Sequence, residues 1–281
     1  MVKKDIRMVA FDCDGTLFSN HGRISEYGLE ILHEMRNRNI RVVICTGRPL
    51  YSIRNTMPEG SYDYAVCENG QTVAKADGTI IDQKRNLNPE EIREITSKCE
   101  KYRVMMSCAY DDEFHHFTSR RHHLYVSSIQ HLKNIARKML GRRLWSDDMD
   151  SDYARLAHYD ISKICFTGIP SVLRRLAASF DSEKYSILFT SPGWLEIQPY
   201  GISKGGGLRK LMETEQIERD QCAALGDGEN DLSMIIEAGT GVAMKNAMST
   251  VKDAADMITE YSCTEDGAAR WVNDHILQKH S

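Results

Sequence analysis

The sequence predicts an α/β fold, with a parallel-sheet core and an inserted α+β domain. Three observations support this prediction. In the first third of the chain, short apolar runs rich in β-branched residues alternate with amphipathic stretches, which is the pattern of βαβ units. From residue 84 to residue 190 helices and strand-like pieces follow in a different order, typical of an α+β unit. The α/β alternation then returns, so the middle segment is expected to interrupt the core.

The core is therefore expected to comprise residues 1–83 and 191–281. Its expected strands and helices are, in order, the strand Met8–Phe11, the helix Ser25–Arg38, the strand Arg41–Cys45, the helix Pro49–Asn55, and the strands Tyr64–Cys67, Cys222–Leu225 and Gly241–Met244. Asp77-Gly78 lies between two short apolar runs and predicts a tight hairpin.

The inserted domain is expected at residues 84–190. Its expected elements are the helix Pro89–Tyr102, strand-like pieces, the helix Ile129–Leu140, an acidic loop Ser146–Asp152, the strand Ile161–Gly168, the helix Pro170–Phe180 and the strand Tyr185–Thr190. Antiparallel strands and helices in this order set the insert apart from the parallel sheet.

Composition excludes several classes of partner. The 281 residues are 41% hydrophobic and 27% charged, which is ordinary for a globular protein. A formal charge of −4 gives no general attraction to nucleic acid or to an anionic membrane, so we expect neither as a partner. The 8 cysteines form no C-x-x-C pair, and we expect reduced, buried thiols. No signal segment or long apolar stretch is evident, which favours the cytoplasm.

Two aspartates follow the first predicted strand in the stretch FDCDGTLFS, residues 11–19. Because side chains at i and i+2 of a strand share a direction, we expect Asp12 and Asp14 to point the same way. Ligands of open parallel sheets bind beyond the carboxyl ends of the strands, where this pair would stand. Thr46 and Gly47 end the next strand in VVICTGRP, residues 42–49, and offer a hydroxyl and a backbone N–H to a phosphate oxygen.

More carboxylates follow the late strand, in GDGENDLSM at residues 226–234. Asp227 and Asp231 join the first pair at one edge of the sheet. Like charges about 4 Å apart repel by roughly 4 kcal/mol at an effective dielectric constant near 20, so a cation is expected among them. All-oxygen ligation is the preference of Mg²⁺ rather than Zn²⁺. A mobile Lys204, in GISKGGGL at residues 201–208, is expected to supply a second positive charge.

These four stretches, in this order, resemble the four signature motifs of the haloacid dehalogenase-like (HAD) phosphohydrolase superfamily. The insert, between TGR and SKG, is similar in position to the large α/β cap, type IIB or C2, of the Cof-type branch. The resemblance implies a Rossmann-like core and a cap that sets substrate specificity. Lys245 departs from the pattern, since many members carry glycine there.

The resemblance also implies roles for the motif residues. Asp12 would attack phosphorus and become an aspartyl phosphate, while Asp14 would act as general acid and then general base. Mg²⁺ would be held by the Asp12 carboxylate, the Asp14 carbonyl and the Asp227 carboxylate, with Asp231 close by. The groups that would bind the phosphoryl oxygens are Thr46, the Gly47 amide, Asn230 and Lys204.

Three functions fit these residues. The leading one is a Mg²⁺-dependent phosphomonoesterase acting on small phosphorylated metabolites, most readily sugar phosphates. The second is a phosphosugar mutase or phosphotransferase, because the same aspartyl phosphate can be passed to a sugar hydroxyl. The third is a receiver-type signalling domain, which also phosphorylates an aspartate; it is disfavoured because such domains are about half this length and carry no inserted cap.

Substrate choice is expected to depend on the insert, which contains FHHFTSRRHH at residues 114–123. Its histidines and arginines, His115, His116, Arg120, Arg121, His122 and His123, allow three interpretations. They form an exposed loop between strands, a polar surface that contacts substrate, or a zinc site. Arg48 and Trp194 are further candidates for substrate contact, with a solvated arginine and a packed tryptophan as the plainer alternatives.

Overall fold

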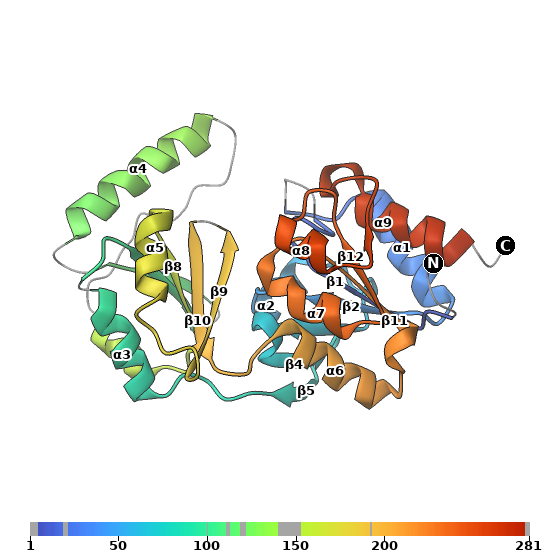
Figure 1. The fold of residues 1–281 in the computed structure, drawn as a ribbon, viewed down its shortest axis with the longest axis horizontal. Coiled ribbons are helices and arrows are strands. Elements are labelled where there is room, and N and C mark those ends of the chain that lie inside the picture. The colour runs from blue at the N-terminus through green and yellow to red at the C-terminus, as the bar shows by residue number, and fades with distance from the viewer. Residues whose placement is uncertain are drawn as a thin grey trace. The chain divides into compact units, whose positions relative to one another are not determined.

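The computed structural model describes residues 5–18, 22–99, 101–110, 113–118, 122–139, 153–191 and 193–278. The chain divides into two compact units (Figure 1). Unit 1 comprises Met1–Lys84 and Gly201–Ser281, and unit 2 comprises Arg85–Tyr200. Unit 1 is thus built from both ends of the chain.

Unit 1 contains an eight-stranded sheet in the part of the chain that is described, in the order β13-β12-β11-β1-β2-β3-β4-β5. Pairing is parallel from β13 to β3 and antiparallel from β3 to β5. The strands are β1 (Met8–Phe11), β2 (Arg41–Cys45), β3 (Tyr64–Cys67), β4 (Thr72–Lys75), β5 (Ile80–Gln83), β11 (Cys222–Gly226), β12 (Thr240–Ala243) and β13 (Met257–Ile258). The prediction of a parallel-sheet core is confirmed, as is the hairpin at Asp77-Gly78, which joins β4 to β5.

Helices cover both faces of this sheet (Figure 1). They are α1 (Glu26–Asn37), α2 (Leu50–Thr56), α6 (Lys204–Glu215), α7 (Leu232–Glu237), α8 (Ser249–Ala254) and α9 (Gly267–Val272). Alternate residues of β1 face opposite ways, as the pleat requires. Val9 and Phe11 pack with α1 and α9, whereas Met8 and Ala10 pack with α6 and α7. β1 is therefore buried on both faces, which explains its uninterrupted apolar sequence.

Unit 2 is an antiparallel five-stranded sheet in the order β7-β6-β8-β10-β9, counted over the described residues. Its strands are β6 (Met105–Tyr110), β7 (Glu113–Phe117), β8 (Ile164–Thr167), β9 (Tyr185–Ser191) and β10 (Trp194–Pro199), and its helices are α3 (Pro89–Cys99), α4 (His123–Met139) and α5 (Pro170–Ala177). Apolar residues of α3 and α5 pack with Phe166 and Ile197 of the sheet in one core. The α+β character expected of the insert is confirmed.

Two expectations about the insert need correction. Residues 191–200 were assigned to the core, but β10 pairs with β8 and β9, so the chain returns to unit 1 only at Gly201. α4 was expected from Ile129, but it begins at His123. Arg120, Arg121 and the whole of the predicted acidic loop Ser146–Asp152 lie outside the described residues.

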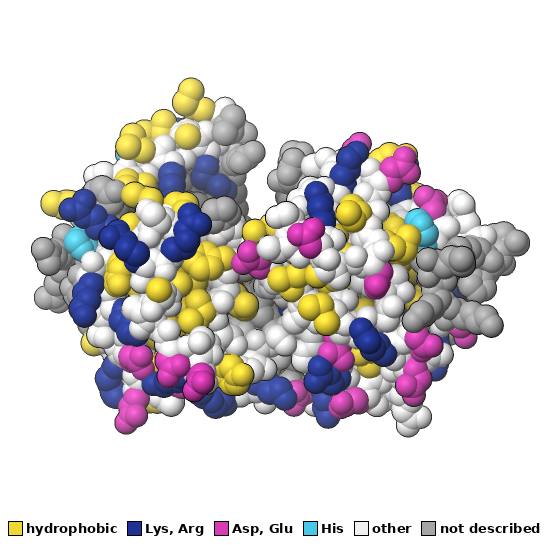
Figure 2. Space-filling view, in the orientation of Figure 1, with side chains coloured by type: hydrophobic (Ala, Val, Ile, Leu, Met, Phe, Trp, Pro, Cys, Tyr) yellow, Lys and Arg dark blue, Asp and Glu magenta, His cyan; other side chains and the backbone are white. Residues whose placement is uncertain are grey.

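The described cysteines other than Cys99 are free and buried, as expected. Among the described helices, none is long and apolar enough to cross a membrane. On the face that Figure 2 shows, basic and acidic side chains are interspersed over unit 1. The described surface of unit 1 on that face therefore carries no broad patch of one charge.

Candidate active site

The site lies at the carboxyl ends of β1, β2, β3 and β11 in unit 1. β1 lies between β2 and β11, so Phe11, Ile44 and Leu225 stand side by side in the register of the sheet. The N–H of Asp12 continues this ladder by donating to the Leu225 carbonyl at 3.0 Å. Segments more than 200 residues apart in the sequence are thus held at one edge of the sheet.

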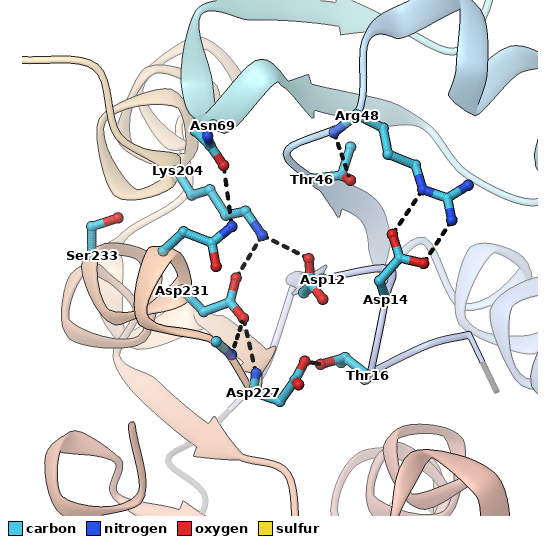
Figure 3. Close-up of polar contacts among 12 residues, drawn as sticks. Asp12, Asp14, Thr16, Thr46, Arg48, Asn69, Lys204, Asp227, Asp231 and Ser233 are labelled. Atoms are coloured by element: carbon cyan, nitrogen blue, oxygen red, sulfur yellow. Dashed lines mark hydrogen bonds and ion pairs between the residues drawn. The ribbon is translucent and has the colours of Figure 1, made fainter. Parts of the chain in front are cut away.

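A buried ion-pair network is the centre of the site (Figure 3). The Lys204 Nζ atom lies 2.6 Å from Asp12 Oδ1 and 2.6 Å from Asp231 Oδ1. The Lys204 side chain is fully buried, which corrects the expectation of a mobile lysine. Burial opposes its positive charge, but the two carboxylates outweigh that effect and raise the pKa of Lys204. The lysine is therefore a fixed cation.

Three carboxylates gather around this cation. Asp12, Asp227 and Asp231 each offer an oxygen within 4.8 Å of the others. Burial, then the nearby Asp231 carboxylate, raises the pKa of Asp12 well above its ordinary value, while Lys204 lowers it. Burial, then Asp231, also raises the pKa of Asp227 to about 7. Three carboxylates against one ammonium leave the cluster short of positive charge, and this all-oxygen set fits a further hard cation.

The loop after β11 is ordered by its own aspartate. Asp231 Oδ2 accepts the backbone N–H groups of Asp227 and Gly228, both at 2.9 Å. Its other oxygen accepts from Lys204, so both oxygens of Asp231 have partners within the protein. Thr16 donates its hydroxyl to Asp227 Oδ1 at 3.0 Å and orients that carboxylate. Asp227 Oδ2 is therefore better placed to bind a ligand than either oxygen of Asp231.

Glycines at the start of α6 and in the turn after β3 allow Lys204 to reach the carboxylates. A Cβ on Gly205 would lie 2.3 Å from the Ser233 carbonyl oxygen, so a side chain there would force α6 away from α7. Gly70 has a φ of +103°, and a Cβ on it would lie 2.1 Å from the Ser203 carbonyl oxygen. Ser203 caps the helix by accepting the Gly206 N–H at 3.1 Å. Close packing at these glycines fixes the first turn of α6, which carries Lys204.

Asp14 does not share the partners of Asp12. β1 ends at Phe11, so the strand rule that would align the two side chains does not apply. The Asp14 side chain is 58% exposed and pairs with Arg48 through two hydrogen bonds (Figure 3). Three carboxylates therefore lie together, rather than the expected four, and Asp14 forms a separate ion pair with Arg48.

The residues expected to bind phosphate surround the same edge. Thr46 is buried, and its backbone N–H and C=O bond to Val66 and Asn69. Gly47 follows it at the end of β2. Asn230 donates its amide to Asn69 Oδ1 at 3.1 Å. Together with Lys204, these groups supply hydrogen-bond donors to one small region.

Sequence reasoning missed several contributors to this site. Thr16, Asn69 and Ser233 were given no role, although each makes a hydrogen bond that orients a site residue or α6. Thr16 could have been found from its place within the first stretch. The partners of the other two lie far away in the sequence, and no spacing rule connects them.

The histidine-rich stretch of the insert is partly a strand. Residues 114–117 belong to β7, so the interpretation as an exposed loop is wrong for them. His116 bonds to Ser107 at 2.8 Å, and burial, then His115, lowers the pKa of His116. Among the described residues the group of potential metal ligands is the three aspartates of unit 1, which gives the zinc interpretation no support. Trp194 donates to Glu196 at 2.9 Å within β10.

Comparison with known proteins agrees with this architecture. The sequence pattern of a family described as haloacid dehalogenase-like hydrolase matches residues 9–272, which include both units. A solved structure of a HAD subclass IIB sugar phosphatase superposes with a TM-score of 0.76 at 22% identity, covering 95% of this chain and 98% of the other. At that identity the likeness establishes the fold.

Relatives whose names state a phosphatase activity include the following two. The 5-amino-6-(5-phospho-D-ribitylamino)uracil phosphatase YcsE of Bacillus subtilis is 26% identical over 276 residues, which cover 97% of each chain. The HMP-PP phosphatase of Klebsiella pneumoniae is 28% identical over 250 residues, covering 88% of this chain and 86% of the relative. The likeness extends over nearly the full length of both chains in each case.

Proposed function

Because the chain belongs to the haloacid dehalogenase-like hydrolase family, we propose that it is a phosphomonoesterase of small phosphorylated metabolites that works through an aspartyl phosphate. The observation that carries the proposal is the buried Asp12 carboxylate, held by the Lys204 ammonium beside Asp227 and Asp231. A phosphoryl group needs a nucleophile and compensating positive charge at one point, and this cluster supplies both.

Asp12 would attack phosphorus, and the bond to the leaving alcohol would break as the aspartyl phosphate forms. Asp14 would donate a proton to the departing oxygen and later accept one from the water that hydrolyses the intermediate. Lys204, Asn230, Thr46 and the Gly47 amide would bind the phosphoryl oxygens and stabilise the charge that develops on them. Splitting a slow hydrolysis into two displacements lowers each barrier.

The cofactor that fits this donor set is Mg²⁺, held by the Asp12 and Asp227 carboxylates and the Asp14 carbonyl, with Asp231 nearby. When bound, Mg²⁺ would neutralise charge on the nucleophile and the phosphoryl group. The negative excess of the three carboxylates supports this assignment.

Sugar phosphates and related metabolites are the proposed substrate class. Relatives that act on small phosphorylated compounds support it, and unit 2 would select among such substrates. The match to a hydrolase family across both units does not favour the receiver-type alternative.

The test is phosphate release from a panel of sugar, nucleotide and cofactor phosphates, with and without Mg²⁺. We expect Mg²⁺-dependent release without a bisphosphorylated activator, whereas dependence on such an activator would instead indicate a mutase. The variant Asp12→Asn should fold and bind Mg²⁺ weakly, and it should release no phosphate in the same assay. Appreciable turnover by that variant would contradict the aspartyl-phosphate route.

A further inference from the structure

The ion pair between Arg48 and Asp14 stands apart from the carboxylate cluster. Arg48 Nε donates to Asp14 Oδ2 at 2.8 Å, and Arg48 Nη2 donates to Asp14 Oδ1 at 2.6 Å. Both carboxylate oxygens thus bond to one planar guanidinium. A two-point contact of this kind fixes the direction of a carboxylate as well as its distance.

Without such a contact the Asp14 side chain would be poorly fixed. It is 58% exposed and follows the end of β1, before a turn in which Gly15 has a φ of +92°. In Figure 3 Asp12 is directed toward Lys204, whereas Asp14 is directed toward Arg48. The carboxylate that has to meet a leaving oxygen thus depends on Arg48 for its orientation.

Arg48 is itself anchored at three points. Its backbone N–H donates to Thr46 Oγ1 at 3.1 Å, at the start of α2. Its Cζ lies 5.2 Å from the centroid of the Phe18 ring, and Phe18 is fully buried. The third anchor is Asp14. The arginine is therefore a rigid support between the end of β2 and the loop after β1.

We propose that Arg48 is a positioning residue for the proposed phosphatase reaction: it holds one oxygen of Asp14, so that the other oxygen, when it carries a proton, is oriented to donate that proton to the leaving alcohol. This inference rests on the proposed function. The pair also neutralises an exposed carboxylate beside a site that must admit a phosphate dianion.

The experiment compares two leaving groups. p-Nitrophenolate departs without protonation, whereas a sugar alkoxide needs a general acid. General acid catalysis typically raises the rate of such a step 10²–10⁴-fold. We expect Arg48→Met to lower kcat roughly 10- to 100-fold on the sugar phosphate that the unmodified protein hydrolyses fastest, because only part of the general-acid contribution depends on orientation. On p-nitrophenyl phosphate the pre-steady-state release of p-nitrophenolate, which reports formation of the aspartyl phosphate and not the later water step that also uses Asp14, should slow less than about threefold. KM should stay within about twofold for both substrates.

A double-mutant cycle separates action through Asp14 from other roles. Since Arg48 would act through Asp14, Arg48→Met should cost almost nothing further in an Asp14→Asn background. Arg48→Lys keeps the charge but loses the two-point geometry, so its kcat should be intermediate. Arg54→Met, which replaces an exposed arginine of α2 six residues after Arg48, is the matched control and should leave kcat unchanged.

Equal losses on both substrates, a rise in KM alone, or additive losses in the cycle would overturn the inference. The first two outcomes would assign Arg48 to phosphate binding or to general stability. These results differ from failure of the proposed function itself, in which the unmodified protein would release no phosphate from any sugar phosphate.

Discussion

Replacing Lys204 with methionine should destabilise unit 1 strongly when no divalent cation is present. Each contact of Nζ with Asp12 and Asp231, at 2.6 Å, has a Coulomb energy of about 6 kcal/mol at an effective dielectric constant of 20. The cost of removing three charges from water offsets most of that gain. Deleting one partner of a buried pair leaves the others uncompensated, which costs roughly 3–5 kcal/mol. We therefore expect Lys204→Met to lower the free energy of unfolding of unit 1 by roughly that amount.

The assay is urea unfolding followed by fluorescence of Trp271, which is buried in unit 1, in a background where Trp145 and Trp194 are replaced by phenylalanine. Lys210→Met is the matched control, because Lys210 lies on the same helix and is half-buried. Mg²⁺ should restore part of the loss, about 2.7 kcal/mol at a concentration 100 times its dissociation constant. If the two variants had the same midpoint without Mg²⁺, the charge argument for this site would be refuted.

Two further predictions concern the same edge of the sheet. The pKa of Asp227 is raised to about 7 in the folded protein, so between about pH 4 and pH 7 the folded state binds a proton that the unfolded state has lost. Without a divalent cation, the free energy of unfolding should therefore fall as pH rises through that range. Thermal unfolding at pH 5 and pH 8 measures this, and an unchanged difference in Asp227→Asn would contradict it. Gly205→Ala should reduce both stability and activity, because its Cβ would lie 2.3 Å from the Ser233 carbonyl oxygen. Gly206→Ala, whose Cβ meets only Ser203 Oγ at 3.3 Å, should leave activity intact and gain up to about 1 kcal/mol.

Sequence patterns predicted the core well because its signals are local. β1, β2, β3 and β11 are short apolar runs buried on both faces, and each is followed by a turn with polar groups. Because these strands run parallel, the turns that follow them lie at one edge of the sheet. Asp12, Asp227 and Asp231 were found in this way.

What failed depended on contacts that spacing does not encode. Lys204 was expected as a functional cation but also as a mobile one, and its burial follows from two carboxylates that lie 192 and 27 residues away in the sequence. The orientation of Asp14 was mistaken because β1 ends at Phe11, three residues before Asp14, so the strand rule does not reach that residue. β10 escaped detection because Glu196 and Gln198 are buried polar residues, which obscure an apolar pattern.

The central position of β1 affects how the protein is made. One neighbour of β1, β2, is synthesised soon after it, whereas the other, β11, leaves the ribosome only after all of unit 2. Unit 2 is contiguous in the sequence, so its sheet has all its strands while β1 still lacks a partner along one side. Long-range pairing of this kind slows folding and exposes strand edges to aggregation. We therefore expect chaperones to protect the N-terminal strands of the nascent chain.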